Sequence, residues 1–131
     1  MQLNGPLMIT VNHRHMAEGK RNTVASCPVA LAIREALSER LARCGITFEI
    51  HVVVTPTTLV AYWMWWPYHA IPTPPEVGTW IKRFDAGADV APLNFVVDSQ
   101  TWLSGLAEDL HRMAQTVDRL RSQPDEIVIA G

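Results

Sequence analysis

The sequence predicts an α+β domain, with a small and mostly antiparallel sheet of three to five strands and helices packed on it. At 131 residues the chain is long enough for one domain with its own core, so stability requires neither a metal nor a disulfide. Residues 47–55 and 57–68 are rich in β-branched and aromatic side chains, which is typical of strands. An apolar residue recurs at every fourth position of residues 28–43, the spacing of an amphipathic helix: Val29, Ile33, Leu37 and Leu41.

The first half of the chain contains clear helix boundaries. Residues 7–11 read as a short strand, after which Asn12 can cap a short helix that Gly19 ends. Pro28 suits the first turn of the long helix, because its missing N–H has no partner to lose there.

The second half predicts a hairpin, a helix and a strand. The Thr-Pro-Thr-Thr link has hairpin length, and "IPTPP" indicates a rigid extended linker. The expected order is a strand (47–55), a returning strand (57–68), a linker (71–75), a helix that begins at Thr73 or Pro75 and ends at Asp85, and a strand (93–98).

The tail differs from this core. We therefore divide the chain into an α+β core domain, residues 1–98, and a C-terminal helical extension, residues 99–131. Apolar residues in the extension alternate at spacings of three and four, which is typical of a helix–helix seam. That helix either packs on its own core or forms the interface of a homo-oligomer, most simply a dimer. The seam consists of Leu103, Leu106, Leu110, Met113, Val117 and Leu120.

Composition and charge limit the function classes. Residues 1–50 carry six cations and four anions, whereas residues 51–131 carry five cations and nine anions, a balance that argues against nucleic-acid binding. Only 18% of residues are charged and 48% are apolar, so we expect a surface that invites a partner. A helix at 28–43 separates Cys27 and Cys44 by roughly 25 Å, which excludes a disulfide between them.

Two free thiols suggest a reducing compartment. The sequence begins without a signal-peptide pattern, and its longest apolar stretch, residues 59–71, is too short to cross a bilayer. We therefore expect a cytoplasmic protein that does not engage a membrane.

A basic corner leads into the long helix and is the main candidate binding site. Cations beside free N–H groups at a helix start can hold a phosphate, a nucleotide or an acidic protein surface. A solvated basic loop is the alternative, and no phosphate-loop motif of nucleotide hydrolases is present. The candidate residues are His13, Arg14, His15, Lys20, Arg21 and Cys27.

Three roles are possible for Cys27: a nucleophile, a metal ligand or a packed core residue. Its place at a helix start favours a thiolate, and a nucleophile would also need a histidine base. A metal site would need four ligands at short spacings, and "HRH" with one cysteine does not supply them, so we predict no metal and no cofactor. The favoured interpretation is that Cys27 is a packed, unreactive side chain at the start of the helix.

The aromatic run around Trp63, Trp65 and Trp66 places large rings on both faces of a strand. One face can fill the core. The other must be covered by the tail helix, by a second subunit or by a flat ligand such as a base.

Several segments resemble a family of small bacteriophage and prophage proteins. The matching segments are "ITV", "GKR", "CPVALA", "PEVGTWIKRFDAG" and "PLNF", spread over roughly residues 7–97. The chain departs from the family in having "NTVAS" where relatives often carry an extra cysteine, and in its longer tail. The resemblance implies a phage origin and expression in a host cytosol, and it implies no activity.

We therefore expect a non-enzymatic phage accessory protein. It would bind a host factor, or sequester an anionic small molecule such as a signalling nucleotide, in anti-defence or host takeover. The alternative is a small enzyme, based on a thiol or a histidine, that acts on a phosphorylated or nucleotide substrate.

Overall fold

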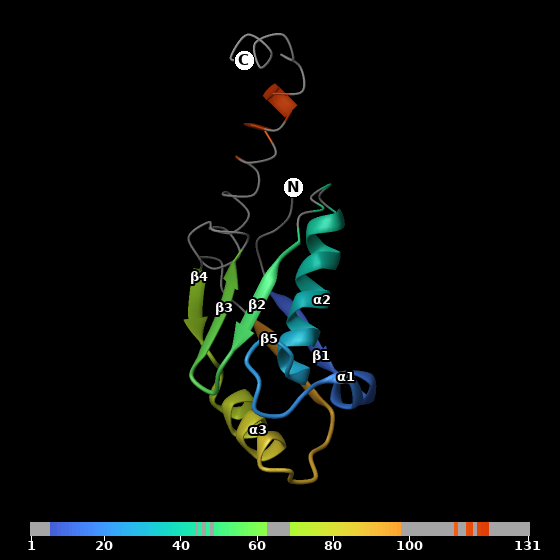
Figure 1. Cartoon of the computed structure of the whole chain (residues 1–131), viewed down its shortest axis with the longest axis vertical. Coiled ribbons are helices and arrows are strands. Elements are labelled where there is room, and N and C mark those ends of the chain that lie inside the picture. Colours follow the sequence, from blue (N-terminus) through green and yellow to red (C-terminus); the bar gives the residue numbers. More distant parts are fainter. Residues whose placement is uncertain are drawn as a thin grey trace, which may run out of the picture.

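The computed structural model describes residues 6–43, 45, 47, 49–62, 69–97, 112, 115, 116 and 118–120. Helices and antiparallel strands pack together, which confirms the predicted α+β class (Figure 1). The elements are β1 (Leu7–Val11), α1 (His13–Glu18), α2 (Pro28–Arg43), β2 (His51–Val54), β3 (Thr58–Tyr62), β4 (His69–Pro72), α3 (Pro75–Asp85) and β5 (Leu93–Val97).

The strands form two sheets rather than the single sheet that we expected. The first and last strands of the core, β1 and β5, pair antiparallel from Leu7 opposite Val97 to Val11 opposite Leu93. The other three strands form an antiparallel meander in the order β2-β3-β4. Two sheets could not be distinguished from one in the sequence, because a pattern of residues indicates that a segment is extended but does not indicate which strand it pairs with.

Two boundaries in the meander also differ from the prediction. β2 begins at His51 instead of residue 47. The segment expected to be a linker contributes its first residues to β4, which ends at Pro72. Proline is tolerated there because β4 is an edge strand of the meander, where a missing N–H need not cost a ladder hydrogen bond.

The core surrounds α2, whose predicted bounds are confirmed. This helix packs against β1, β2 and α1, so one helix joins the two sheets. Each large aliphatic side chain buried here contributes about 1.5–3 kcal/mol to the free energy of folding. The buried apolar face of α2 includes Val29, Ile33, Leu37 and Leu41, each at most 2% exposed.

Local signals set the ends of α1. The Asn12 side chain accepts a hydrogen bond from the backbone N–H of His15, and the His15 ring accepts one from the backbone N–H of Asn12. This reciprocal arrangement satisfies two backbone donors at the helix start. The Gly19 backbone N–H then donates to the His15 carbonyl, as expected for the end of this short helix.

The predicted extension lies mostly outside the described residues. Arg112, Gln115, Thr116 and residues 118–120 are helical, and Leu120 is half exposed. The other five seam residues are not described, so the choice between self-packing and an oligomer interface stays a prediction. Within the described part of the chain, none of the helices has the length and apolar character of a membrane span.

Gly78 on α3 packs against the β2–β3 turn. A Cβ atom at this position would lie 2.4 Å from the Pro56 carbonyl oxygen, a backbone atom that cannot swing away. We therefore expect Gly78→Ala to lower the free energy of unfolding by about 1–3 kcal/mol. Urea denaturation measures the change. Thr79→Ala, one residue along and exposed, is the control and should stay within about 0.5 kcal/mol of the wild type; equal stability of the two variants would contradict the close packing.

Candidate functional site

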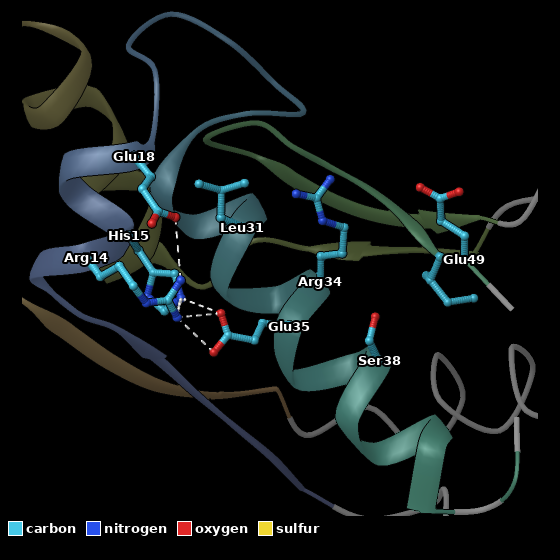
Figure 2. Close-up of a pocket in the computed structure, with 9 residues that line it drawn as sticks. Arg14, His15, Glu18, Leu31, Arg34, Glu35, Ser38 and Glu49 are labelled. Atoms are coloured by element: carbon cyan, nitrogen blue, oxygen red, sulfur yellow. Dashed lines mark hydrogen bonds and ion pairs between the residues drawn. The ribbon is translucent and has the colours of Figure 1, made fainter. Parts of the chain in front are cut away.

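A polar pocket of about 350 Å³ lies between α1, α2 and the residues that lead into β2 (Figure 2). Two helices and a strand entrance thus contribute to one cavity. Most of the side chains that line it are charged or polar, and Leu31 and Ile50 add apolar contact. Its lining residues are Arg14, His15, Glu18, Leu31, Arg34, Glu35, Ser38, Glu49 and Ile50.

Glu35 on α2 gathers the side chains at one end of this pocket. Arg14 Nη2 donates to both of its carboxylate oxygens, at 3.0 and 2.7 Å, and His15 Nε2 lies 3.0 Å from Oε2. Arg14 Nη1 also reaches Glu18 at 3.5 Å. The two carboxylates therefore neutralise Arg14, which the sequence analysis assigned to an anion site.

The hydrogen bonds determine which nitrogen of His15 carries the proton. The backbone N–H of Asn12 donates to Nδ1 at 3.1 Å, so Nδ1 acts as an acceptor. The proton of the neutral ring then lies on Nε2 and is donated to Glu35. Both ring nitrogens are occupied and the side chain is only 3% exposed. His15 therefore has no free lone pair with which to act as a general base.

The hydrogen bonds at this end of the pocket stabilise the charged forms of Glu35 and Arg14. The hydrogen bond from Arg14, followed by that from His15, holds the pKa of Glu35 below its usual value. The same contact with Glu35 raises the pKa of Arg14. Glu35 is thus an anion held by two donors.

Arg34 is the second cation of the pocket, and it is differently placed. No hydrogen bond or ion pair joins its guanidinium to any residue that the structure describes. Ser38 lies one turn further along α2 and lines the same cavity, as does Glu49 from the strand entrance. In Figure 2, Arg34 points away from the Glu35 cluster. Arg34 and Ser38 are both exposed and can therefore donate hydrogen bonds to an anionic group of a ligand.

The helix start at Cys27 is not an open anion cradle. Cys27 is 1% exposed, and its Sγ accepts a hydrogen bond from the Ala30 backbone N–H at 3.4 Å. Burial raises the pKa of the thiol, which favours the protonated form. Pro28 is buried as well, and Gly19 lies so close to it that a Cβ there would be 2.6 Å away. The first turn of α2 is covered by the preceding loop.

The remaining residues of the basic corner lie apart from the pocket. Arg21 lies over the Phe84 ring, 5.6 Å from its centroid, and the Asn22 backbone N–H donates to Asp85 at 2.9 Å. Lys20 and His13 are exposed. The structure thus brings Arg14 and His15 together at Glu35, whereas Arg21 fastens its loop to the end of α3.

Other predicted features can be placed only in part. Trp63, Trp65 and Trp66 lie outside the described residues. Among the residues that the structure does describe, no cluster of histidine, cysteine and carboxylate side chains could hold a metal.

The sequence analysis missed the five other polar residues of the pocket, as well as Leu31 and Ile50. Alternation with the buried positions of α2 was the only sign that three of the polar residues face outward. The five polar residues are Glu18, Arg34, Glu35, Ser38 and Glu49.

Comparison with protein-family models, curated proteins and solved structures finds no match to this chain.

The lowered pKa of Glu35 predicts a pH dependence of stability. Its ion pairing stabilises the fold above the ordinary carboxyl pKa and is lost as the pH falls through the lowered folded-state pKa. At pH 7 we expect Glu35→Gln to be less stable than the wild type by at most about 1 kcal/mol, because the carboxylate is half exposed. In urea denaturation at a series of pH values, this difference should shrink toward zero in acid. Glu39→Gln, which removes a carboxylate from an exposed ion pair on the same helix, is the control. A stability difference between the wild type and Glu35→Gln that stays constant with pH would refute the stabilising role assigned to the ion pairs of Glu35.

The burial of Cys27 predicts an inert thiol. In a Cys44→Ser background, we expect a disulfide reagent to label native Cys27 about 100-fold more slowly, or slower still, than the urea-unfolded chain, because labelling requires opening of the core. Absorbance of the released thiolate follows the reaction. Labelling of the native protein as fast as the unfolded chain would contradict the buried position and revive the thiol-enzyme alternative.

Proposed function

We propose that this chain is a non-enzymatic accessory protein of phage origin that sequesters a small molecule bearing one phosphate or carboxylate, such as a nucleoside monophosphate. The ligand binds in the pocket between α1, α2 and β2. The observation that carries this proposal is Arg34, a pocket guanidinium without a partner among the described residues.

The charges around Arg34 favour a ligand with a single anionic group. The pocket holds the carboxylates of Glu18, Glu35 and Glu49 against the guanidiniums of Arg14 and Arg34, and Arg14 is already paired. A polyphosphate would meet more repulsion than attraction. A monophosphate can bind Arg34 and Ser38, while the amino groups of its base donate to Glu18 or Glu49.

The chemistry of the same residues supports binding rather than catalysis. The ring nitrogens of His15 are both engaged, and Cys27 is buried with a raised pKa. Among the side chains that the structure describes, no histidine hydrogen-bonds to the Cys27 thiol. A nucleophile paired with a base, which the enzyme alternative requires, has no support here.

A host protein is the second candidate ligand. Met8 and Val96 are cross-strand neighbours and are 60% and 42% exposed, which supports contact with an apolar protein surface. In either case the setting is host takeover or anti-defence in the host cytosol, which rests on the resemblance to phage proteins.

Calorimetric titration with a nucleoside, its monophosphate and its triphosphate tests the proposal. We expect the monophosphate to bind most tightly. Arg34→Ala should weaken its binding roughly 10- to 100-fold, the usual effect of losing a charge-assisted hydrogen bond. Arg43→Ala removes the same charge from the same helix outside the pocket and should leave binding unchanged.

Two results would overturn the small-molecule proposal. One is a failure of all these compounds, and of simple carboxylates, to bind. The other is binding that Arg34→Ala and Arg43→Ala weaken equally, which would indicate a general charge effect.

A further inference from the structure

The strand β1 has an edge whose own residues carry none of the usual protection against pairing. It is one of two strands in its sheet, so each strand has one edge without a partner among the described residues. Natural edge strands are commonly blocked by a charge, a proline or a bulge. The five residues of β1, "LMITV", contain no charge and no proline, and their register with β5 is unbroken.

Burial along β1 is symmetric about its central residue. Leu7, Ile9 and Val11 are buried, whereas Met8 and Thr10 between them are exposed. An antiparallel copy of β1, centred on Ile9, would set Leu7 opposite Val11 and Met8 opposite Thr10. Every buried position then faces a buried position and every exposed one an exposed one, as continuation of a sheet requires.

The start of this strand borders a hollow in the described surface. A groove of about 200 Å³ lies between the start of β1 and the second half of α2, lined by Leu7, Met8, Ala36, Glu39, Arg40 and Arg43. Met8 is 60% exposed although it belongs to a strand at the core. The start of β1 is therefore accessible on this side.

We propose that β1 pairs antiparallel with β1 of a second copy of this chain, which makes one four-stranded sheet in the order β5-β1-β1-β5. A two-fold axis passes near Ile9, so the interface is made by the same surface of both copies. Backbone hydrogen bonds across the axis provide the attraction, as in other complexes that form by strand addition.

Two properties favour a second copy as the occupant. An uncharged strand meets no repulsion from itself, and its symmetric burial pattern makes it complementary to itself. A two-stranded sheet is also marginal by itself, and two further strands relieve this. The inference is independent of the ligand proposed for the pocket.

Paired substitutions test both the interface and its register in the full chain. Met8→Lys with Thr10→Lys places like charges opposite each other twice per dimer. Met8→Glu with Thr10→Lys places opposite charges at the same positions. Sedimentation equilibrium at low salt gives the dimer dissociation constants. We expect the constant of M8K/T10K to exceed that of M8E/T10K by about tenfold or more, and the wild type to be dimeric.

The control variant is Asn94→Lys with Val96→Lys, which adds the same charge to the exposed positions of β5. It should leave the dimer intact, and thermal melting should show that every variant remains folded. A monomeric wild type would overturn the proposal. Equal dissociation constants of M8K/T10K and M8E/T10K would also overturn it, because any dimer contact would then lie elsewhere. Dissociation caused only by the β5 substitutions would overturn it as well.

Discussion

The packing of α2 against both sheets is the constraint on which the rest of the structure depends. The helix contacts β1 and β2, which belong to different sheets and do not hydrogen-bond to each other. Its buried face joins them through a shared core. Its other face carries Arg34, Glu35 and Ser38 into the pocket. The geometry of the candidate site therefore follows from how one amphipathic helix is placed, and a shift of α2 would move the core and the pocket together.

The cap of α1 connects this helix to the pocket. The His15 ring completes the hydrogen bonds at the start of α1 and also donates to Glu35 on α2. A neutral ring suits both tasks, because a proton on Nδ1 would face the Asn12 N–H. His15, which the sequence analysis assigned to the anion-binding basic corner, thus orients Glu35, which in turn pairs with Arg14.

Two of the five segments on which the expected resemblance to phage proteins rests lie side by side in the structure. The loop that follows Gly19 stacks Arg21 on Phe84 and bonds Asn22 to Asp85, at the end of α3. Asn22 has a φ of 57°, a left-handed conformation that asparagine tolerates better than most residues. The spacing of "GKR" and "RFDAG" in the sequence therefore has a structural explanation, which is the attachment of this loop to α3, and it does not by itself identify a binding site.

The sequence alone determined the three helices α1, α2 and α3, because periodicity, caps and prolines act within a few residues. It placed α2 at residues 28–43 and located α1 between Asn12 and Gly19, as the structure has them. The tertiary structure decided the division of the strands into two sheets, the pairing of β4, and the site itself. Glu35 lies 20 residues from His15, and no local rule relates their side chains until α1 packs on α2. That packing turns a predicted anion corner into a largely neutralised cluster and leaves the remaining positive charge at Arg34.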